Sequence, residues 1–258
     1  MSEQRLPKKR FGQHFLKDPN TARIVASGVT KDDVVLEVGP GRGFLTAFLA
    51  ERASLVHAVE IDPDVLPSLR KSLGDRDNVV VHRGDALRFD YSALDPAPNR
   101  LAANLPYNIA SPLVLRLLEE VDTLRTLRFM VQLEVARRMA AERGTKDYAA
   151  YAVLAQLLAS VKVLHRVPPT VFDPPPRVHS AVVEMGRKSK PDGYEGIKRL
   201  VLAAFKSRRK RLVNNLPEPV RREAPLVLQS LGYGPDARAE ELAPEDFMSL
   251  YAELSWAL

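Results

Sequence analysis

Val34-Val35-Leu36-Glu37-Val38-Gly39-Pro40-Gly41-Arg42-Gly43 is the stretch that decides the fold class of this 258-residue chain. Its first five residues are mostly apolar and β-branched, which is typical of a buried strand, and three glycines then make a turn. The apolar pattern continues as a helix through Phe48 and Leu49. A buried strand, a glycine turn and a helix form the repeating unit of open α/β sheets. The glycines also allow a ligand to approach the backbone closely.

This strand-and-helix unit repeats along the chain. Further buried strands are predicted at residues 55–59, 78–82, 101–103 and 127–131. Helical patterns separate them, and this alternation indicates a parallel sheet with helices on both faces. Two later strands, at residues 161–167 and 180–185, are expected to form an antiparallel edge. The prediction is a Rossmann-like α/β fold with a mostly parallel seven-stranded sheet.

The composition limits the classes of protein to consider. The chain has 38 basic and 32 acidic residues, a net charge of +6 and a pI near 9.5, which favours a polyanionic partner. It has no cysteine, so disulfides and cysteine-ligated zinc are excluded. The sequence has no apolar run of membrane-spanning length and no signal-peptide core near its start. We therefore expect a cytoplasmic protein that does not act in a membrane.

Polar residues at the ends of three strands predict a nucleoside pocket. Glu60 follows Gly39 by 21 residues, at the end of the second strand, where it can accept both ribose hydroxyls. Asp85 follows the third strand and can accept from the exocyclic amine of an adenine. Each residue alone is equally compatible with a solvated surface. Because parallel strands end at one sheet edge, the combination favours a pocket, whose predicted lining also includes Ile61 and Ala86.

The glycine spacing bears on which nucleoside binds. Dinucleotide sites use G-x-G-x-x-G, whose third glycine packs the helix on the strand beside a pyrophosphate. Here the spacing is Gly39-x-Gly41-x-Gly43, preceded by Glu37. This pattern fits a cofactor without a pyrophosphate whose amino-acid end needs room above the loop. The predicted cofactor is S-adenosylmethionine, and no metal is expected.

Asn104-Leu105-Pro106-Tyr107 is the predicted catalytic segment. It ends the fourth strand and precedes Ser111-Pro112, which we expect to start a helix with serine as the cap and proline at the first position. The Asn104 side chain and the Leu105 carbonyl can accept both hydrogens of an exocyclic amine, and the Tyr107 ring can stack on the base that carries it. The alternative is an ordinary turn, because Asn and Pro are common turn residues.

Two further segments keep open alternatives. Residues 168–176 hold five prolines in nine residues around Phe172, a stiff loop that either fixes this ring for binding or serves as a connector with a core phenylalanine. Residues 1–10 hold four basic residues and one acidic residue, and they are either a disordered tail or a basic arm that binds a phosphate backbone. Beyond them, Asp18-Pro19 is expected to open a helix that reaches about Gly28.

Charge divides the last part of the chain. Residues 187–222 hold 12 basic and three acidic side chains, whereas residues 223–258 hold one basic and seven acidic. We predict a catalytic domain over residues 1–186 and a small helical RNA-binding domain over residues 187–258, with the cations of residues 206–211 on a helix. The alternatives are a solvated helix face or neutralisation by the acidic segment. The predicted RNA contacts are Lys8, Lys9, Arg10, Arg137, Arg138, Lys206, Arg208, Arg209, Lys210 and Arg211.

Six motifs carry a family resemblance, in this order: Phe11-Gly-Gln-His-Phe-Leu16, Glu37-Val-Gly-Pro-Gly41, Asn104-Leu-Pro-Tyr-Asn108, Gly144-Thr-Lys-Asp-Tyr148, Phe172-x-Pro174-x-Pro176-x-Val178-x-Ser180 and Phe205-Lys-Ser-Arg-Arg-Lys-Arg-Leu212. They resemble those of the KsgA-type ribosomal RNA adenine dimethyltransferases. The resemblance implies a class I methyltransferase fold. It also implies transfer of methyl groups to N6 of two adjacent adenosines near the 3′ end of small-subunit ribosomal RNA, late in ribosome assembly, by an enzyme expected to be a monomer.

The resemblance also implies roles for individual residues. The cofactor contacts would be His14, Leu16, Gly39, Glu60, Asp85 and Asn104, while Tyr107 and Phe172 would sandwich the target base. The family often has asparagine at the position of His14. Two rival functions remain: a large-subunit ribosomal RNA methyltransferase that confers macrolide resistance, and a non-catalytic nucleic-acid-binding assembly factor on the same fold. The Gly144–Tyr148 and Arg208-Arg209 segments favour the KsgA type over the first rival, and Glu60, Asp85 and Asn104 argue against the second.

Overall fold

The computed structural model describes residues 13–218 and 220–254. Lys8, Lys9 and Arg10, the predicted basic arm, lie outside the described residues. The chain divides into two compact units, one made of residues 1–136 and 161–187 and the other of residues 137–160 and 188–258. In the described ranges, no helix is long and apolar enough to cross a membrane.

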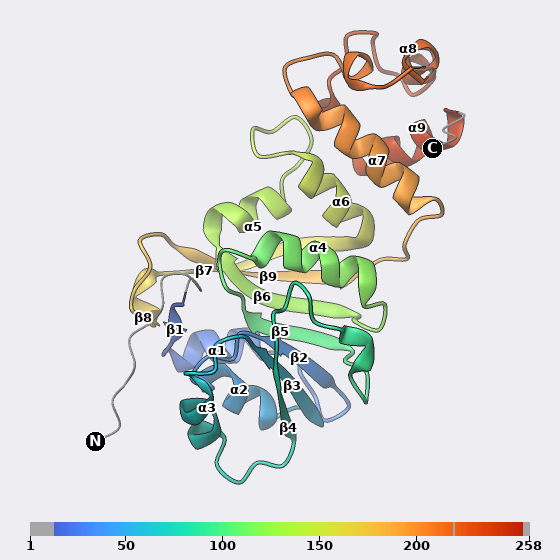
Figure 1. The fold of residues 1–258 in the computed structure, drawn as a ribbon. Helices are drawn as coiled ribbons and strands as arrows, with labels where there is room; N and C mark the ends of the chain where they lie inside the picture. Colours follow the sequence, from blue (N-terminus) through green and yellow to red (C-terminus); the bar gives the residue numbers. More distant parts are fainter. Residues whose placement is uncertain (1–12, 219, 255–258) are drawn as a thin grey trace. The chain divides into compact units, whose positions relative to one another are not determined.

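The first unit is built around a seven-stranded sheet with the order β4-β3-β2-β5-β6-β9-β7 (Figure 1). Its strands are β2 Val34–Val38, β3 Leu55–Glu60, β4 Val79–Arg83, β5 Arg100–Asn104, β6 Thr126–Gln132, β7 Ala159–Val167 and β9 Ser180–Arg187. Strands β2 to β6 pair in parallel, and β9 runs antiparallel to β6. The chain leaves β2 toward β3 and β4 and later returns to β5 on the other side. The carboxyl ends of β2 and β5 therefore flank a topological switch point, where open sheets bind ligands.

The predicted fold class is confirmed, because the strands alternate with helices. The helices of this part are α1 Pro19–Val25, α2 Phe44–Ala50, α3 Leu66–Leu73, α4 Ala110–Glu120 and α5 Leu133–Met139. Helix α1 packs on α2 and β6, and α2 also packs on β3 and β5. The buried side chains of Val25, Leu45, Leu49 and Val56 join one apolar cluster there, which holds the helices on the sheet.

Two predicted helix boundaries are wrong. Asp18 does cap α1, since its carboxylate accepts from the backbone N–H of Thr21 at 2.7 Å, but the helix ends at Val25 and not near Gly28. Helix α4 begins at Ala110, so Ser111 is not its cap. The backbone N–H of Ile109 bonds to the Pro106 carbonyl, which starts the turn early. Pro112 still fits, because the first turn of a helix needs no intrahelical N–H bonds.

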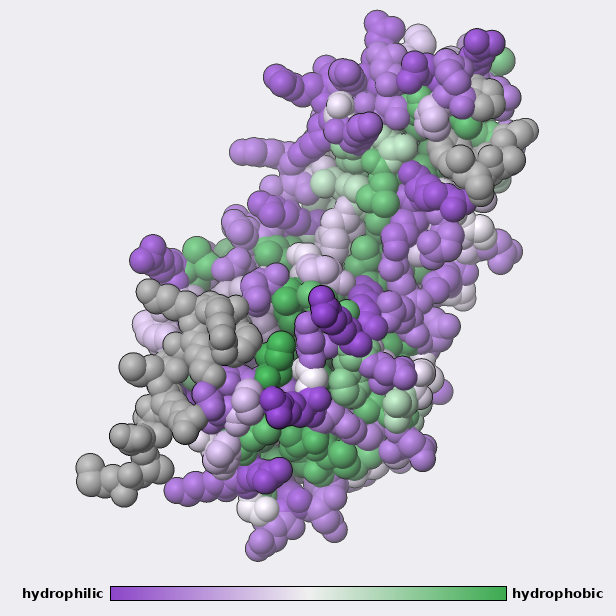
Figure 2. Space-filling model, in the orientation of Figure 1, coloured by the Kyte–Doolittle hydropathy of each residue, from purple (hydrophilic) through white to green (hydrophobic). Residues whose placement is uncertain are grey.

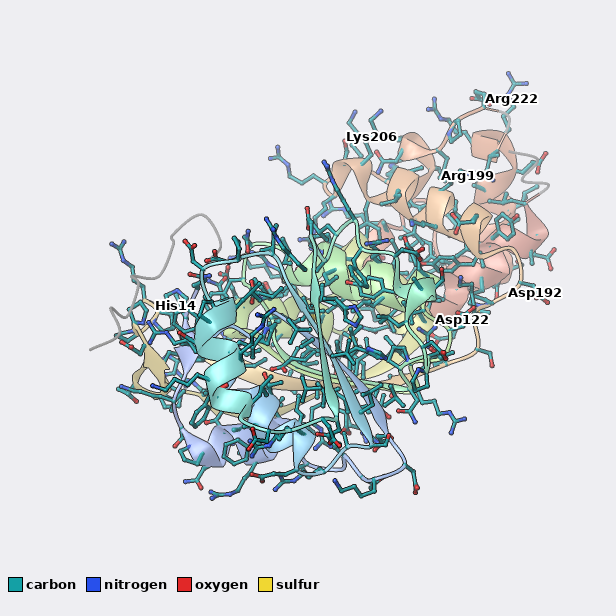
Figure 3. The ribbon with its side chains drawn as sticks, turned by 60° about the horizontal axis from the view of Figure 1, so that its bottom comes forward. His14, Asp122, Asp192, Arg199, Lys206 and Arg222 are labelled. Carbon is teal, nitrogen blue, oxygen red and sulfur yellow. The ribbon has the colours of Figure 1, made fainter. Side chains whose placement is uncertain are left out.

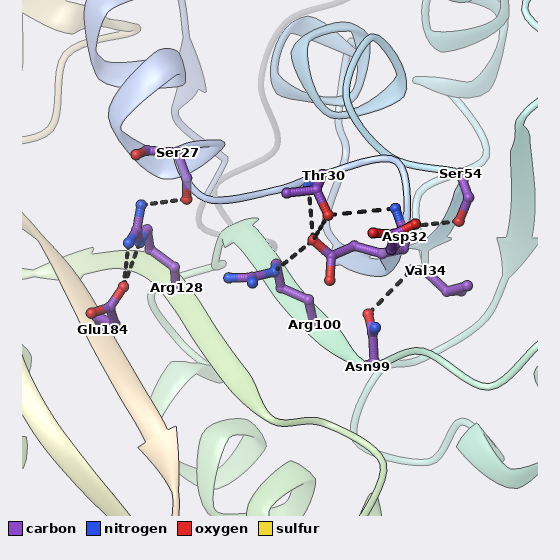
Figure 4. Close-up of polar contacts among 10 residues, drawn as sticks. Ser27, Thr30, Asp32, Val34, Ser54, Asn99, Arg100, Arg128 and Glu184 are labelled. Atoms are coloured by element: carbon purple, nitrogen blue, oxygen red, sulfur yellow. Dashed lines mark hydrogen bonds and ion pairs between the residues drawn. The ribbon is translucent and has the colours of Figure 1, made fainter.

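Polar contacts tie α1 and the following loop to the sheet (Figure 4). The Arg128 guanidinium binds the Glu184 carboxylate and also donates to the Ile24 and Ser27 carbonyls near the end of α1. At the start of β2, the Val34 N–H donates to the Asn99 side chain at 3.1 Å. These bonds lie near the amino-terminal ends of β2 and β6, which is the end of the sheet opposite to the predicted site.

The second unit is helical. Its elements are α6 Ala150–Leu158, α7 Tyr194–Ala204, η4 Phe205–Ser207, η5 Leu212–Asn215, α8 Val220–Ser230, η6 Ala239–Glu241 and α9 Pro244–Glu253. The rings of Tyr148 and Phe205 lie 6.1 Å apart and those of Phe205 and Phe247 5.9 Å apart. Residues 137–160 belong to this unit because α6 packs on α7 and α9. The grouping thus differs from the predicted domains 1–186 and 187–258, although the later boundary falls within one residue of the predicted one.

The cationic segment of residues 206–211 does not form the predicted helix, because only Lys206 and Ser207 lie in a short 3₁₀ turn. Helix α7 ends at Ala204, and a short 3₁₀ turn and a bend follow. The Asn215 side chain donates to the Ala204 carbonyl at 2.7 Å and to the Ser207 carbonyl at 3.1 Å. Because these carbonyls near the helix end find a side-chain partner, the chain can turn here.

Figure 2 shows that hydrophilic residues cover most of the face in view.

Candidate cofactor and substrate site

A cavity of about 530 Å³ lies at the carboxyl ends of β2 to β5. It is formed wholly within the first unit. Almost all predicted cofactor and catalytic residues line it, namely His14, Leu16, Gly39, Gly41, Glu60, Ile61, Asp85, Ala86, Asn104, Leu105, Pro106 and Tyr107. Phe172 does not line it. The structure therefore brings together residues from five distant segments of the chain at the edge where the strand pattern predicts a ligand.

The glycine loop has a shape that other residues would not tolerate. Gly39 and Gly41 both have positive φ, 72° and 55°. A Cβ at Gly39 would lie 3.1 Å from the Pro106 ring, and a Cβ at Gly41 would lie 2.9 Å from the Phe15 ring. Glycine thus lets the loop approach both Pro106, in the predicted catalytic segment, and Phe15.

Glu60 joins this loop to the end of β3. One carboxylate oxygen accepts from the Gly41 N–H at 3.1 Å and the other from the Asp62 N–H at 2.8 Å. The side chain is nearly inaccessible, and burial raises the pKa of Glu60. Each carboxylate oxygen has a second lone pair, so the group can still accept from two hydroxyls of a ligand.

Asn104 presents a buried acceptor to the cavity. Its amide Nδ2 donates to the His14 carbonyl at 3.0 Å, a bond that assigns which side-chain atom is the oxygen. The other atom, Oδ1, is buried and has no partner among residues 13–218 and 220–254. Buried polar atoms are almost always paired, so an unpaired acceptor in a cavity indicates that a ligand donates to it.

Tyr107 is held at both ends of its side chain. Its hydroxyl and the Ser180 hydroxyl are 2.6 Å apart, and its ring lies 5.4 Å from the His14 ring. Burial raises the pKa of Tyr107, so the hydroxyl is protonated near neutral pH. The phenol is therefore a fixed flat surface rather than a proton acceptor.

Residues 13–17 line one part of the cavity, and Figure 3 labels His14 among them. Strand β1, Phe15–Leu16, pairs antiparallel with β8, Phe172–Asp173. His14 Nδ1 lies 2.8 Å from the Pro174 carbonyl, and Gln13 donates to Asp62 at 2.9 Å. These contacts join the first motif of the sequence to the proline-rich segment.

The cavity residues that sequence reasoning missed include Gln13, Arg42 and Asp173. The Arg42 guanidinium lies 4.3 Å from the Phe15 ring centroid and 3.5 Å from the Asp173 carboxylate. Gln13 lies within the N-terminal motif, which was a usable signal. The sequence carried no signal for the contact between Arg42 and Asp173, because it depends on the pairing of β1 with β8.

Glu37 adds an uncharged carboxyl to the cavity lining. The residue is buried, and its Oε2 has no partner among the residues that the structure describes. Burial raises the pKa of Glu37 to about 8. The group is therefore mostly protonated at neutral pH and can donate as well as accept a hydrogen bond.

Known proteins place the chain in a family. The sequence profile of the family described as "Ribosomal RNA adenine dimethylase" matches residues 5–255. The chain belongs to the ribosomal RNA adenine dimethylase family. It is 72% identical to the ribosomal RNA small subunit methyltransferase A of Rubrobacter xylanophilus over 96% of this chain and 95% of that protein. It is 40% identical to the protein of the same name from Neisseria gonorrhoeae, over 94% of each.

Solved structures agree with this family assignment. A dimethyladenosine transferase from Plasmodium falciparum superposes with a TM-score of 0.81 at 26% identity, covering 92% of this chain and 96% of that one. The 23S rRNA methyltransferase ErmE superposes with a TM-score of 0.74 at 30% identity, covering 93% and 99%. The adenine dimethylase fold is thus shared with an enzyme whose name refers to the other ribosomal subunit.

Phe172 is placed differently from the other predicted residues of this adenine dimethylase. Its side chain is fully buried in the apolar cluster beneath the cavity, and its backbone pairs with Leu16. This placement fits the alternative reading, a rigid connector with a core phenylalanine. The sandwich of Tyr107 and Phe172 around a base is not formed in this conformation and stays a prediction.

The predicted RNA contacts separate into exposed and paired cations. Arg137 and Arg138 are exposed on α5, as are Lys206 (labelled in Figure 3), Arg209 and Lys210 in the second unit. Arg208 instead binds Glu240 at 2.6 Å and the Lys146 carbonyl at 2.8 Å, and Arg211 binds Asp236 at 2.8 Å. The acidic segment therefore neutralises part of the basic one. No group of three metal-ligating side chains occurs in the described part of the chain.

Proposed function

We propose that this protein transfers methyl groups from S-adenosylmethionine to N6 of two adjacent adenosines near the 3′ end of small-subunit ribosomal RNA, late in assembly of the subunit. The observation that carries the proposal is the buried, unpaired Asn104 Oδ1 in the cavity, beside the fixed ring of Tyr107. We further propose that it works in the cytoplasm as a monomer, with the second unit as its RNA-binding domain.

The residues of the cavity suit S-adenosylmethionine. Gly39 and Gly41 carry no side chains, which leaves room above these two positions of the loop for the amino-acid end. Glu60 retains two lone pairs for the ribose hydroxyls, and Asp85 lines the same wall for the adenine amine. Bound there, the cofactor supplies an electrophilic methyl group on a sulfonium. The protein contributes binding and exclusion of water.

The Asn104 segment binds and orients the amine that accepts the methyl group. The N6 lone pair of adenine is delocalised into the ring, which makes the amine a poor nucleophile. Hydrogen bonds from N6–H to Asn104 Oδ1 and to the Leu105 carbonyl favour the pyramidal amine, and Tyr107 stacks on the base. Direct in-line displacement then depends mainly on positioning. The base must be unstacked to enter, which costs a few kcal/mol, less for a loop adenine.

Two rival functions make different predictions about substrate. A large-subunit methyltransferase shares the fold and the Asn-x-Pro-Tyr motif, but the more similar relatives carry small-subunit names. A non-catalytic assembly factor would have no use for an unpaired acceptor in a cofactor-sized cavity.

The test is methyl transfer to isolated ribosomal subunits that lack the modification. Labelled S-adenosylmethionine is offered with small or large subunits, and we expect label in small-subunit RNA at adenine N6. Label in the large subunit would favour the resistance enzyme. Tight binding to small subunits with no label in either RNA would favour the non-catalytic factor.

A further inference from the structure

Strand β7 is exposed along most of its length. It lies at one edge of the seven-stranded sheet, and residues 162–166 are all exposed. Even the apolar side chains of Val163 and Leu164 are 42% and 43% exposed. The opposite edge strand, β4, leaves fewer residues open. The strand edge of β7 is therefore open to a partner, with one exposed apolar side chain on each of its faces.

Strand β7 carries basic side chains and no acidic ones. Residues 159–167 include Lys162, His165 and Arg166 and no acidic residue. None of these three side chains has a hydrogen bond or ion pair with any residue in the described ranges. Some other cations of the same unit are matched, as Arg128 is by Glu184. The β7 cations are therefore available to an anionic partner.

The spacing along the strand is regular. Lys162, Leu164 and Arg166 alternate with their neighbours, so they share one face of β7. At about 3.3 Å per residue, the two cations stand about 13 Å apart with an apolar side chain between them. Two cations that flank an apolar surface fit a nucleic-acid strand, which offers phosphates on either side of a flat base or a ribose.

The strand leads to the cavity. After Val167, the short helix η3, Pro169–Val171, and then β8 follow, and Figure 1 shows β8 beside β1. The Val171 carbonyl accepts from the Lys17 N–H at 2.9 Å, and Asp173 lines the cavity. An RNA strand on β7 would thus continue toward the mouth of the site.

We propose that Lys162, Leu164 and Arg166, the β7 strip, form a docking surface for ribosomal RNA that flanks the target adenosines. This inference rests on the proposed function for the identity of the RNA. Lys162 and Arg166 contact phosphates, and Leu164 contacts the nucleotide between them. The strip positions the substrate and takes no part in the chemistry.

The experiment compares two double variants of the full chain that lose equal charge. Lys162→Ala/Arg166→Ala changes the strip. Arg70→Ala/Lys71→Ala changes two exposed cations of α3, which leads into β4 at the other edge of the sheet. Affinity for unmethylated small-subunit RNA is titrated at several salt concentrations. The slope of log affinity against log salt is negative, and each lost phosphate contact reduces its magnitude by up to about one unit. For the strip variant we therefore expect a reduction in magnitude of up to about two units.

The control should keep the parent slope, and the strip variant should raise KM for RNA with kcat little changed. The proposal would be overturned if the two variants had equal slopes. It would also be overturned if the strip variant bound RNA normally but lost affinity for a ribosomal protein. If the alanine variant melts early, Lys162→Gln/Arg166→Gln serves instead. Failure of the proposed function is seen separately: the parent would transfer no methyl group to small-subunit RNA, whatever the slopes are.

Discussion

Truncation of Asn104 separates its chemical role from its structural one. Asn104→Ala removes the unpaired Oδ1 and also the Nδ2 bond to the His14 carbonyl. Loss of one hydrogen-bonding group aimed at a reacting centre costs about 10²–10³-fold in turnover. Loss of a neutral hydrogen bond costs about 0.5–1.5 kcal/mol of stability. For a chain of this size each kcal/mol lowers Tm by about 2–4 °C.

Asn99 provides the matched control. It lies just before the start of β5, whereas Asn104 is the last residue of this strand. Its side chain accepts from the Val34 N–H at 3.1 Å. Asn99→Ala should lower Tm by a similar amount, because it also removes one hydrogen bond, but it should leave turnover unchanged.

The assay is single-turnover methyl transfer to unmethylated small subunits with both substrates saturating, run beside thermal melts and RNA titrations. We expect Asn104→Ala to bind RNA normally and to lose at least about 10²-fold in rate. Turnover within a few-fold of the parent, or an equal loss in Asn99→Ala, would refute the assignment of Asn104 as the amine acceptor.

Three further outcomes are expected. Glu60→Ala should weaken S-adenosylmethionine binding at least about tenfold by calorimetry, since each charge-assisted hydrogen bond is worth about 1.5–3 kcal/mol; unchanged affinity would mean that the ribose lies elsewhere. Burial raises the folded-state pKa of the Glu37 carboxyl from 4.5 to about 8. The contribution of this group to the free energy of unfolding is therefore fully present below pH 4.5 and is lost as the pH rises toward about 8. Glu37→Gln should remove that fall in melts across this range, and an unchanged pH profile would contradict the shift. Arg209→Ala should lower the salt slope of RNA binding without changing Tm, whereas Arg208→Ala should lower Tm because Glu240 loses its partner; the reverse pattern would show that Arg208 is the RNA contact.

The elements that sequence predicts well are those set by local patterns. The seven strands of the main sheet begin and end within two residues of the predicted positions, because apolar runs and glycine turns are contiguous in the chain. The ligand edge followed from the same pattern, since Gly39, Glu60 and Asp85 each lie at the end of a strand or within two residues after it. The fold and most of the cavity could therefore be derived before any tertiary contact was known.

What sequence did not predict depends on partners far apart in the chain. Residues 137–160 group with the second unit because α6 packs on α7 and α9, which lie later in the sequence. The cations of residues 206–211 had the right charge for RNA, yet only the folded chain shows that Arg208 meets Glu240. Charge counts predict the sign of a surface but not which of its members are already paired.

The position of His14 predicts that its side chain can be replaced while Asn104 keeps its orientation. The residue reaches Asn104 through its backbone carbonyl, which takes the amide Nδ2 and so leaves Oδ1 turned to the cavity. Any residue at position 14 supplies that carbonyl, so the asparagine often found there in the family is compatible with the same orientation. What the N-terminal segment must preserve is its path, and this is set by the pairing of β1 with β8. The segment that borders the cavity thereby also fixes the orientation of Asn104 Oδ1.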